Sequence, residues 1–186
     1  MPYGPQHPQN HPSAKAALPR QVAAKILDRK ALIATRARLR AEGRSLVQCH
    51  GCFDIVHPGH IRHLRQARSL GDVLLVSITG DDTMKKGTGR PLIPQELRAE
   101  NLAALDCVDF VAINRWATAV EAIRLLRPDS YVKGQEFANL ARPPVRLQAE
   151  IDAVHAVGGD VRFTHEAVFS STALLNTHAA KEDASS

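Results

Sequence analysis

The stretch LVQCHGCFDIVHPGH, residues 46–60, decides the fold of this chain. It opens with an apolar run of strand length, passes through a turn that contains Gly51, and closes on the sequence His-Pro-Gly-His. Apolar residues then recur at positions 61, 64 and 67, which is the spacing of one face of a helix. Proline is favoured at the first position of a helix, so this helix is expected to begin at Pro58. The stretch therefore predicts a strand, a tight loop and a helix in succession.

The same alternation continues through the rest of the chain. Asp28 and Gly43 are expected to bound a further helix, because Asp is a preferred N-cap and Gly a preferred residue just past a helix end. Alternating strands and helices predict an α/β fold, here a Rossmann-like parallel five-stranded sheet with helices on both faces. The expected strands are 46–49, 73–78, 108–113, 130–133 and 161–164, and the expected helices are 28–42, 58–70, 94–105, 118–126, 144–157 and 170–176.

Length and composition fit one domain with short extensions. Residues 1–24 are rich in proline and lack the apolar segment of a secretory signal, so we expect a disordered tail and a cytoplasmic protein. Residues 25–178 are expected to form the domain, and residues 179–186 a second tail. No apolar run approaches the roughly 20 residues of a membrane span, so no membrane partner is expected. Three cysteines, an odd number, favour free thiols over a disulfide framework.

Positive charge is concentrated in one segment. The chain carries a formal net charge of +5, yet residues 20–44 hold eight Lys and Arg against only Asp28 and Glu42. That segment alone has a surplus of six, so the remainder of the chain is slightly acidic. A solvated helix face explains this pattern better than a phosphate-backbone footprint, and no nucleic-acid partner is expected.

His57 and His60 flank the predicted start of the helix at Pro58. With His57 as N-cap, the backbone N–H groups of Gly59, His60 and Ile61 are expected to point out of the helix, where its dipole also favours an anion. A histidine in this position is biased toward its neutral form, whereas a bound polyphosphate favours the cation. Transfer of a nucleotidyl group builds negative charge on oxygens of the α-phosphorus, which imidazole donors can stabilise. The turn therefore predicts a phosphate site in which His57 and His60 are catalytic.

Longer sequence matches extend this interpretation. GCFDIVHPGH followed by LRQARSLGD resembles the signature of the cytidylyltransferase-like nucleotidyltransferase family, part of the superfamily that shares the HxGH motif. The similarity continues through KKGTGRPLIPQELRAENLAALDCVDFVAI, VKGQEF and FSSTALLN, and covers about residues 25–177. Within the family the chain is most similar to the sugar-phosphate adenylyltransferase domain of bifunctional heptose enzymes. That domain is often fused to a sugar kinase, so a fused or separate kinase is an implied partner, and a homodimer is common.

The resemblance also implies roles for individual residues. His57 and His60 would contact the triphosphate, and Lys86 would be a third catalytic residue that contacts phosphate groups. Lys85, the adjacent candidate, and Arg98 would bind the substrate. The implied nucleotide-binding residues are Gly51, Cys52, Phe53, Gly59, Lys133 and Gly134, together with Ser170, Ser171 and Thr172 at the start of the last helix.

The implied reaction joins a heptose 1-phosphate-like sugar to ATP, releases pyrophosphate and gives an ADP-sugar. Mg²⁺ is expected to arrive with the triphosphate, and Asp81 and Asp82 could hold it through water. The alternative is a CTP-dependent enzyme acting on glycerol 3-phosphate or another small phosphomonoester. Related cytidylyltransferases carry an arginine-containing RTEGIST-like stretch where residues 165–172 read HEAVFSST, so the choice of nucleotide stays open.

Other classes of function fit the sequence less well. Cys49 and Cys52 with His57 and His60 offer four possible zinc ligands, although the alternating directions of strand side chains do not obviously bring them together, and no metal site is expected. A nucleotide-binding regulatory module without chemistry is disfavoured by the intact histidines and Lys86. A fragment of an aminoacyl-tRNA synthetase is disfavoured because a second lysine-rich signature is missing.

Overall fold

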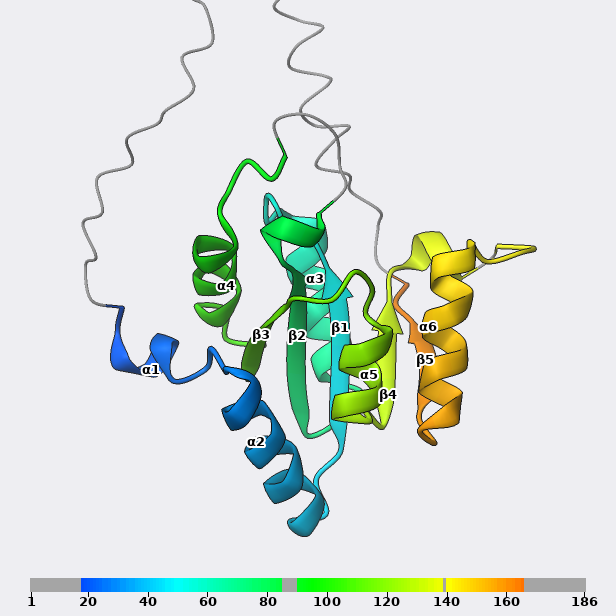
Figure 1. The fold of residues 1–186 in the computed structure, drawn as a ribbon, viewed down its shortest axis with the longest axis horizontal. Coiled ribbons are helices and arrows are strands. Elements are labelled where there is room, and N and C mark those ends of the chain that lie inside the picture. The colour runs from blue at the N-terminus through cyan, green and yellow to red at the C-terminus, as the bar shows by residue number, and fades with distance from the viewer. Residues whose placement is uncertain (1–17, 85–89, 139, 166–186) are drawn as a thin grey trace, which may run out of the picture.

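The structure, a computed structural model, describes residues 18–84, 90–138 and 140–165. Its centre is a sheet of five parallel strands in the order β3-β2-β1-β4-β5 (Figure 1). This confirms the predicted Rossmann-like α/β fold, with β1 two residues longer than expected and β3 beginning two residues later. The strands are β1 Leu46–Gly51, β2 Val73–Thr79, β3 Phe110–Asn114, β4 Ser130–Lys133 and β5 Asp160–Phe163.

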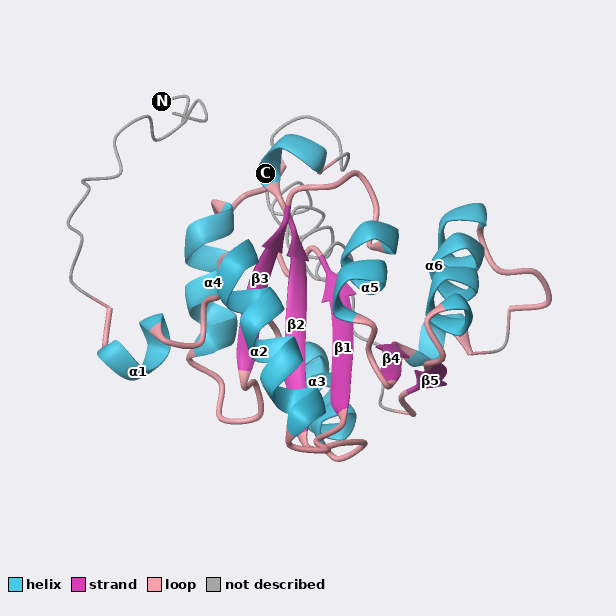
Figure 2. Ribbon diagram, turned by 60° about the horizontal axis from the view of Figure 1, so that its bottom comes forward, coloured by secondary structure: helices cyan, strands magenta, loops and turns pink. Residues whose placement is uncertain are grey.

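Helices cover both faces of the sheet, as predicted. Figure 2 shows α2 and α5 in front of the strands and α3 behind them. The expected helix at 170–176, the main parts of both predicted tails and the end of the predicted domain lie outside the described residues. The helices are α1 Arg20–Ala23, α2 Arg29–Ala41, α3 Pro58–Arg68, α4 Gln95–Ala103, α5 Val120–Leu126 and α6 Val145–Ala156, with short 3-10 helices η1 Asp81–Thr83 and η2 Gln135–Phe137.

The helix boundaries follow local chemistry. Asp28 caps α2, because its Oδ1 accepts a hydrogen bond from the Ala31 amide at 2.7 Å. Gly43 follows α2 with φ +67°, a left-handed conformation that glycine adopts at little cost. Pro58 is the first residue of α3 and His57 is its N-cap. Each of these boundaries was predicted from the sequence.

The region before residue 25 differs from the expectation of a disordered tail. Residues 20–23 form α1, and Val22 packs against the core of the sheet. The segment after α1 then pairs with β3, since the Leu27 amide donates to the carbonyl of Val111 and the Val111 amide donates to the carbonyl of Lys25, both at 2.8 Å. The structured region thus begins before residue 25, because an apolar side chain and a backbone ladder fix this segment on the edge strand.

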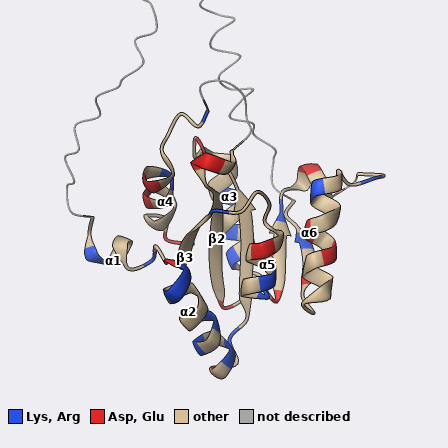
Figure 3. Ribbon diagram, viewed as in Figure 1, with Lys and Arg blue, Asp and Glu red and all other residues tan. Residues whose placement is uncertain are grey.

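The distribution of charge agrees with the sequence. Lys and Arg are prominent along α2, whereas α5 and α6 carry charges of both signs (Figure 3). None of the helices in the described part of the chain is long and apolar enough to cross a membrane.

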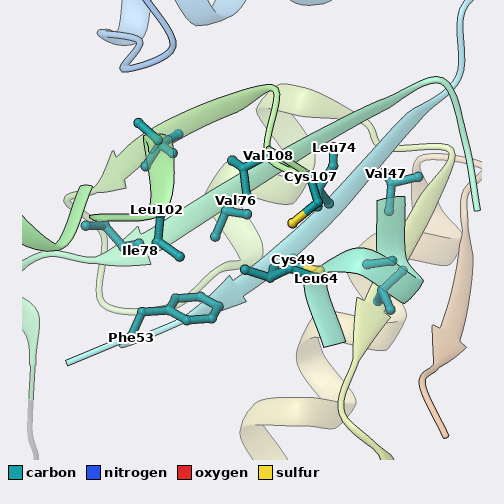
Figure 4. Packing of buried hydrophobic residues seen from close by; sticks show 14 of the residues in the cluster. Val47, Cys49, Phe53, Leu64, Leu74, Val76, Ile78, Leu102, Cys107 and Val108 are labelled. Atoms are coloured by element: carbon teal, nitrogen blue, oxygen red, sulfur yellow. The ribbon is translucent and has the colours of Figure 1, made fainter. Parts of the chain in front are cut away.

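The two faces of the sheet differ in polarity. The face toward α3 and α4 is apolar along the whole length of the strands, and Figure 4 shows Phe53 at one end of this core cluster, with Cys49 between it and Leu64. The opposite face is apolar only where the strands begin, around Leu46 and Leu75. Toward the carboxyl ends of β1, β2 and β3 that face carries the polar side chains of Gln48, His50, Ser77, Thr79 and Asn114.

Arg36 joins α2 to the end of α5. Its side chain is buried, and its guanidinium donates to the carbonyls of Leu126 at 2.7 Å and Arg127 at 2.6 Å. The guanidinium also lies 3.3 Å from the carboxylate of Asp129. A cation in this position satisfies carbonyl groups that the end of a helix leaves without partners.

Replacement of Arg36 by Met is expected to lower the free energy of unfolding by roughly 2–4 kcal/mol, because buried carbonyls lose a charged donor. Urea unfolding followed by circular dichroism measures this change. Arg38→Met, on the same helix with an exposed side chain, is the control and is expected to cost less than about 0.5 kcal/mol. Equal effects of the two substitutions would contradict the role given to Arg36.

Candidate active site

The candidate site lies where the order of the strands reverses. The chain runs outward from β1 to β2 and β3, then returns to place β4 on the other side of β1. In open parallel sheets ligands bind at such a point, beyond the carboxyl ends of the strands. The loop after Gly51 at the end of β1 and the residues Lys133 and Gly134 at the end of β4 meet this edge of the sheet.

His57 and His60 face each other across the start of α3. Their rings are stacked, with centroids 3.8 Å apart and planes inclined by 24°. His57 Nδ1 accepts a hydrogen bond from the His60 amide at 3.4 Å. In the neutral ring the proton therefore sits on Nε2, which makes Nε2 a donor. The predicted pair of imidazoles is thus brought together at the predicted helix start.

The predicted phosphate site has fewer available backbone amides than expected. The Ile61 amide donates to the His57 carbonyl at 3.2 Å, as the fourth residue of a helix does, and the His60 amide is taken by the His57 ring. Of the three amides named from the sequence, only that of Gly59 has no hydrogen-bond partner within the described residues. The prediction for Ile61 was wrong because the first intrahelical hydrogen bond already uses its N–H.

Burial biases His57 toward its neutral form. Removal from water lowers the pKa of the ring below its ordinary value of 6.5, while a hydrogen bond with its own backbone opposes the shift. The direction agrees with the prediction from the sequence, and desolvation is the largest cause of the lowered pKa.

The loop between β1 and α3 is shaped by Phe53. This residue has φ +50°, a left-handed conformation that is uncommon for a side chain of this size. Its ring is buried in the core and lies 5.1 Å from the His60 ring, tilted by 59°. A Cβ atom on Gly51 would lie 3.0 Å from the Phe53 ring, so glycine leaves room for that ring. Both residues, predicted to bind nucleotide, therefore also support His60.

Asp54 ties this loop to the segment that follows residue 89. Its carboxylate accepts hydrogen bonds from the amides of Leu92 at 2.8 Å and Ile93 at 3.0 Å, and from Arg90 at 2.6 Å. Burial pushes the pKa of Asp54 upward, but these hydrogen bonds outweigh it and lower the pKa. Asp54 therefore holds residues 90–93 beside the loop between β1 and α3. The predicted phosphate contacts Lys85 and Lys86 precede this segment in the sequence. Those two lysines lie outside the described residues.

Arg98 occupies a different position from that expected of a substrate-binding side chain. It is fully buried in α4. Its guanidinium donates to the carbonyls of Cys52, Thr79 and Ile93 and pairs with the carboxylate of Asp81. Arg98 thus links the carboxyl end of β1 to that of β2, because the five N–H donors of a guanidinium can satisfy several carbonyls at once.

Asp81 is also committed to structure. One carboxylate oxygen pairs with Arg98, and the other accepts from the Gln95 amide at 3.0 Å. Asp82 beside it is exposed. Of the two acidic residues named for a magnesium ion, Asp82 is exposed, whereas both carboxylate oxygens of Asp81 already accept hydrogen bonds, so the described residues of this loop form no ready-made cage for the metal.

The four possible zinc ligands are not brought together. Cys49 points into the apolar core, whereas Cys52 lies 3.8 Å from the hydroxyl of Thr79, and both are free thiols. In the part of the chain that the structure describes, no group of three or more His, Cys, Asp or Glu is arranged to hold a metal ion. Cys49 lies within β1 and Cys52 follows its end, so the two thiols have different surroundings.

Two further histidines near the site were not predicted. His50 Nδ1 lies 3.0 Å from the Ser77 hydroxyl, and His63 Nδ1 lies 2.9 Å from the Thr164 hydroxyl. Burial, followed by the nearby charge of Lys133, lowers the pKa of His50 to about 3 and that of His63 to about 4. Their positions in the sequence were the available signal, because His50 is the last residue but one of β1 and His63 lies one helical turn after His60.

The predicted nucleotide-binding residues Ser170, Ser171 and Thr172 lie outside the described residues. The last described residues before them, Thr164 and His165, are held by contacts with α3. The His165 amide donates to the side chain of Gln66 at 2.9 Å, in addition to the contact between Thr164 and His63. The chain therefore leaves β5 beside α3.

Comparison with known proteins agrees with this geometry. The model of the family described as cytidylyltransferase-like matches residues 48–186, about three quarters of the chain. The chain belongs to the cytidylyltransferase-like family. This confirms the family predicted from the signature around His57 and His60, and with it the class of enzyme, a nucleotidyltransferase.

Curated relatives of this cytidylyltransferase-like chain are bifunctional proteins HldE. The protein of Trichlorobacter lovleyi is 41% identical over 115 residues, which are 61% of this chain and 23% of that protein. The protein of Geotalea uraniireducens is 40% identical over 140 residues, 74% of this chain and 27% of that protein. The chain spans about a quarter of the length of these relatives.

Solved structures share the fold. The lipopolysaccharide core biosynthesis protein of Thermoplasma volcanium has a TM-score of 0.55 at 23% identity, and the match covers 69% of this chain and 100% of that one. Pantoate-beta-alanine ligase of Francisella tularensis has a TM-score of 0.50 at 14% identity, and the match covers 75% and 66%. At these identities the similarity is one of fold.

Acid is expected to destabilise the domain through His50 and His63. Both histidines titrate near 6.5 in an unfolded chain, so below that pH the unfolded state binds more protons, and stability falls as the pH drops toward 4. At pH 5 each histidine is expected to cost roughly 2 kcal/mol relative to pH 7.5. Urea unfolding at the two pH values measures the loss.

The variants His50→Asn and His63→Asn are each expected to remove about 2 kcal/mol of the acid-induced loss. His155→Asn, on the exposed face of α6, is the control that leaves it unchanged. An acid-induced loss that is the same in all four proteins would disprove the assignment.

Proposed function

We propose that this nucleotidyltransferase joins a phosphorylated sugar, of the heptose 1-phosphate type, to ATP with release of pyrophosphate, giving an ADP-sugar. The observation that carries the proposal is the stacked pair His57 and His60 at the point where strand order reverses. The similarity to bifunctional proteins HldE supports the choice of substrates.

The proposed chemistry is an in-line displacement at the α-phosphorus. An oxygen of the sugar phosphate forms a bond to that phosphorus, while the bond to the bridging oxygen of the β-phosphate breaks and pyrophosphate leaves. His57 Nε2, a ring nitrogen of His60 and the Gly59 amide would donate hydrogen bonds to phosphate oxygens as their charge grows. The histidines act by alignment and charge, so no covalent enzyme intermediate is required.

Magnesium would neutralise charge on the β- and γ-phosphates when bound. Asp82, exposed after β2, is one side chain that could reach it through water. Because the described residues offer no cluster of three ligands, the ion is proposed to arrive with the nucleotide and to be held mainly by phosphate oxygens and water.

Further roles are proposed from the resemblance alone. Lys86, with Lys85 beside it, would contact phosphate groups, and Ser170, Ser171 and Thr172 would form a second phosphate site. A sugar kinase activity, in a fused domain or a separate chain, would supply the sugar phosphate. A homodimer is proposed on the same basis.

A CTP-dependent reaction on glycerol 3-phosphate or another small phosphomonoester is the second candidate. The family description, cytidylyltransferase-like, favours it. Against it, residues 165–172 lack the arginine of the corresponding stretch in related cytidylyltransferases. Base selection in either case is proposed to depend on backbone groups and loop shape.

An assay of pyrophosphate release tests the proposal directly. We expect turnover with ATP and a sugar 1-phosphate among four nucleoside triphosphates and a panel of sugar phosphates and glycerol 3-phosphate. His60→Ala is expected to lower kcat roughly 100-fold or more, because a donor to the developing charge is lost. Arg62→Ala, exposed on the same helix, is the control and should retain the wild-type rate. Wild-type turnover by His60→Ala would remove the central assignment.

Nucleotide binding is expected to raise the pKa of His57. In the ligand-free protein burial holds this pKa below 6.5, and a nearby polyphosphate stabilises the imidazolium. Binding is therefore coupled to proton uptake, so affinity is expected to rise as the pH falls between the bound and free pKa values. NMR titration of the His57 ring with and without nucleotide measures both values, and identical titration curves would refute the prediction.

A further inference from the structure

Glu150, in the middle of α6, is a buried carboxylate with unusual surroundings. It is 2% exposed. Lys133 Nζ lies 3.2 Å from Oε2, the Tyr131 hydroxyl donates to the same oxygen at 3.0 Å, and Arg146 Nε lies 3.7 Å from Oε1. A carboxylate at this depth is costly unless it is paired and hydrogen-bonded. These contacts therefore hold Glu150 in one position.

Lys133 connects this cluster to the candidate site. It is the last residue of β4 and follows Val132, which pairs with Cys49 of β1, and its charge acts on the neighbouring His50. Its ammonium also lies 5.1 Å from the centre of the Phe137 ring. The ammonium has three donors and Glu150 takes one of them, so further donors can serve a ligand at the carboxyl edge of the sheet.

Tyr131 keeps the cluster in a single arrangement. Burial, followed by the negative charge of Glu150, raises the pKa of Tyr131 well above 10. The hydroxyl therefore remains protonated and continues to donate to the carboxylate. Since α6 packs beside β4 and β5 (Figure 1), the carboxylate is delivered by a rigid element and not by a loop.

We propose that Glu150 is a positioning residue, which holds the Lys133 ammonium at the point where strand order reverses, ready to bind a phosphate group of the nucleotide. The inference rests on the proposed function, because it assigns Lys133 to the nucleotide. A free lysine loses much rotamer freedom when a ligand fixes it. A lysine that is already held loses less, so the same contact binds more tightly.

Two substitutions separate positioning from charge. Glu150→Ala removes the anchor of Lys133. Glu150→Gln keeps an oxygen that accepts from Lys133 and Tyr131, and it removes the negative charge that repels a polyphosphate. Positioning therefore predicts weaker nucleotide binding for Glu150→Ala, and binding at least as tight as wild type for Glu150→Gln.

Isothermal titration of the full chain with non-hydrolysable analogues of ATP and CTP tests the inference. For the analogue that wild type binds, Glu150→Ala is expected to raise Kd about tenfold, and Lys133→Met by at least as much. The double variant is expected to bind no more weakly than Lys133→Met alone, because Glu150 acts through Lys133. Arg146→Met, which removes the exposed cation near the same carboxylate, is the control and should stay within about twofold.

The outcomes distinguish failure of the proposed function from failure of the positioning role of Glu150. If wild type binds neither analogue, the proposed function fails. If wild type binds but Glu150→Ala leaves Kd unchanged, or weakens binding equally in the Lys133→Met background, the positioning role is overturned. Should Glu150→Ala fail to fold by circular dichroism, Tyr131→Phe takes its place. It is expected to raise Kd two- to fourfold in wild type and not in Lys133→Met, and an unchanged Kd overturns the role.

Discussion

The turn from β1 into α3 is the constraint on which the site depends. The chain leaves the central strand, reverses direction and covers the back of the sheet within a few residues. Phe53 accomplishes the reversal in a left-handed conformation and inserts its ring in the core. That ring lies against His60, which in turn stacks on His57. Packing of Phe53 in the core thereby restricts the orientations of the His60 and His57 rings, so the relative position of the two imidazoles is set by a buried side chain.

The unequal faces of the sheet follow from the same arrangement. The face toward α3 and α4 is filled with apolar side chains throughout, which supplies most of the hydrophobic stabilisation. The opposite face is polar near the carboxyl ends, where His50 and Ser77 interact with each other. A buried polar group in a sheet contributes little to stability by itself. The buried polar side chains are concentrated at the carboxyl ends of the strands, where ligands bind in folds of this kind. This end of the domain is therefore less stable than an apolar core would be, and acid is expected to weaken it further.

Sequence reasoning succeeded where a short local signal determines the structure. Asp28 and Pro58 bound their helices because capping depends on neighbours in the chain. It failed where the outcome depends on residues distant in sequence. Arg98 was expected to bind substrate, and no local pattern reveals that its guanidinium donates to the carbonyls of Cys52 and Thr79 as well as to that of Ile93 just before α4. Glu150 was invisible for the same reason, since its partners Tyr131 and Lys133 meet it only through the packing of α6 on β4.

The charge states of His57 and Lys133 in the ligand-free domain follow from the cost of burying an unpaired cation. Burial keeps His57 neutral, and Lys133 is paired with a carboxylate, so the ligand-free domain avoids unpaired buried cations at the end of its sheet. An unpaired cation at such depth would cost stability in every molecule, whether or not a ligand is present. Under the proposed function a polyphosphate would reverse this balance, because its charge would favour protonation of the imidazole and would offer the ammonium a second partner. The additional positive charge, that of the His57 imidazolium, would then form only when the ligand binds.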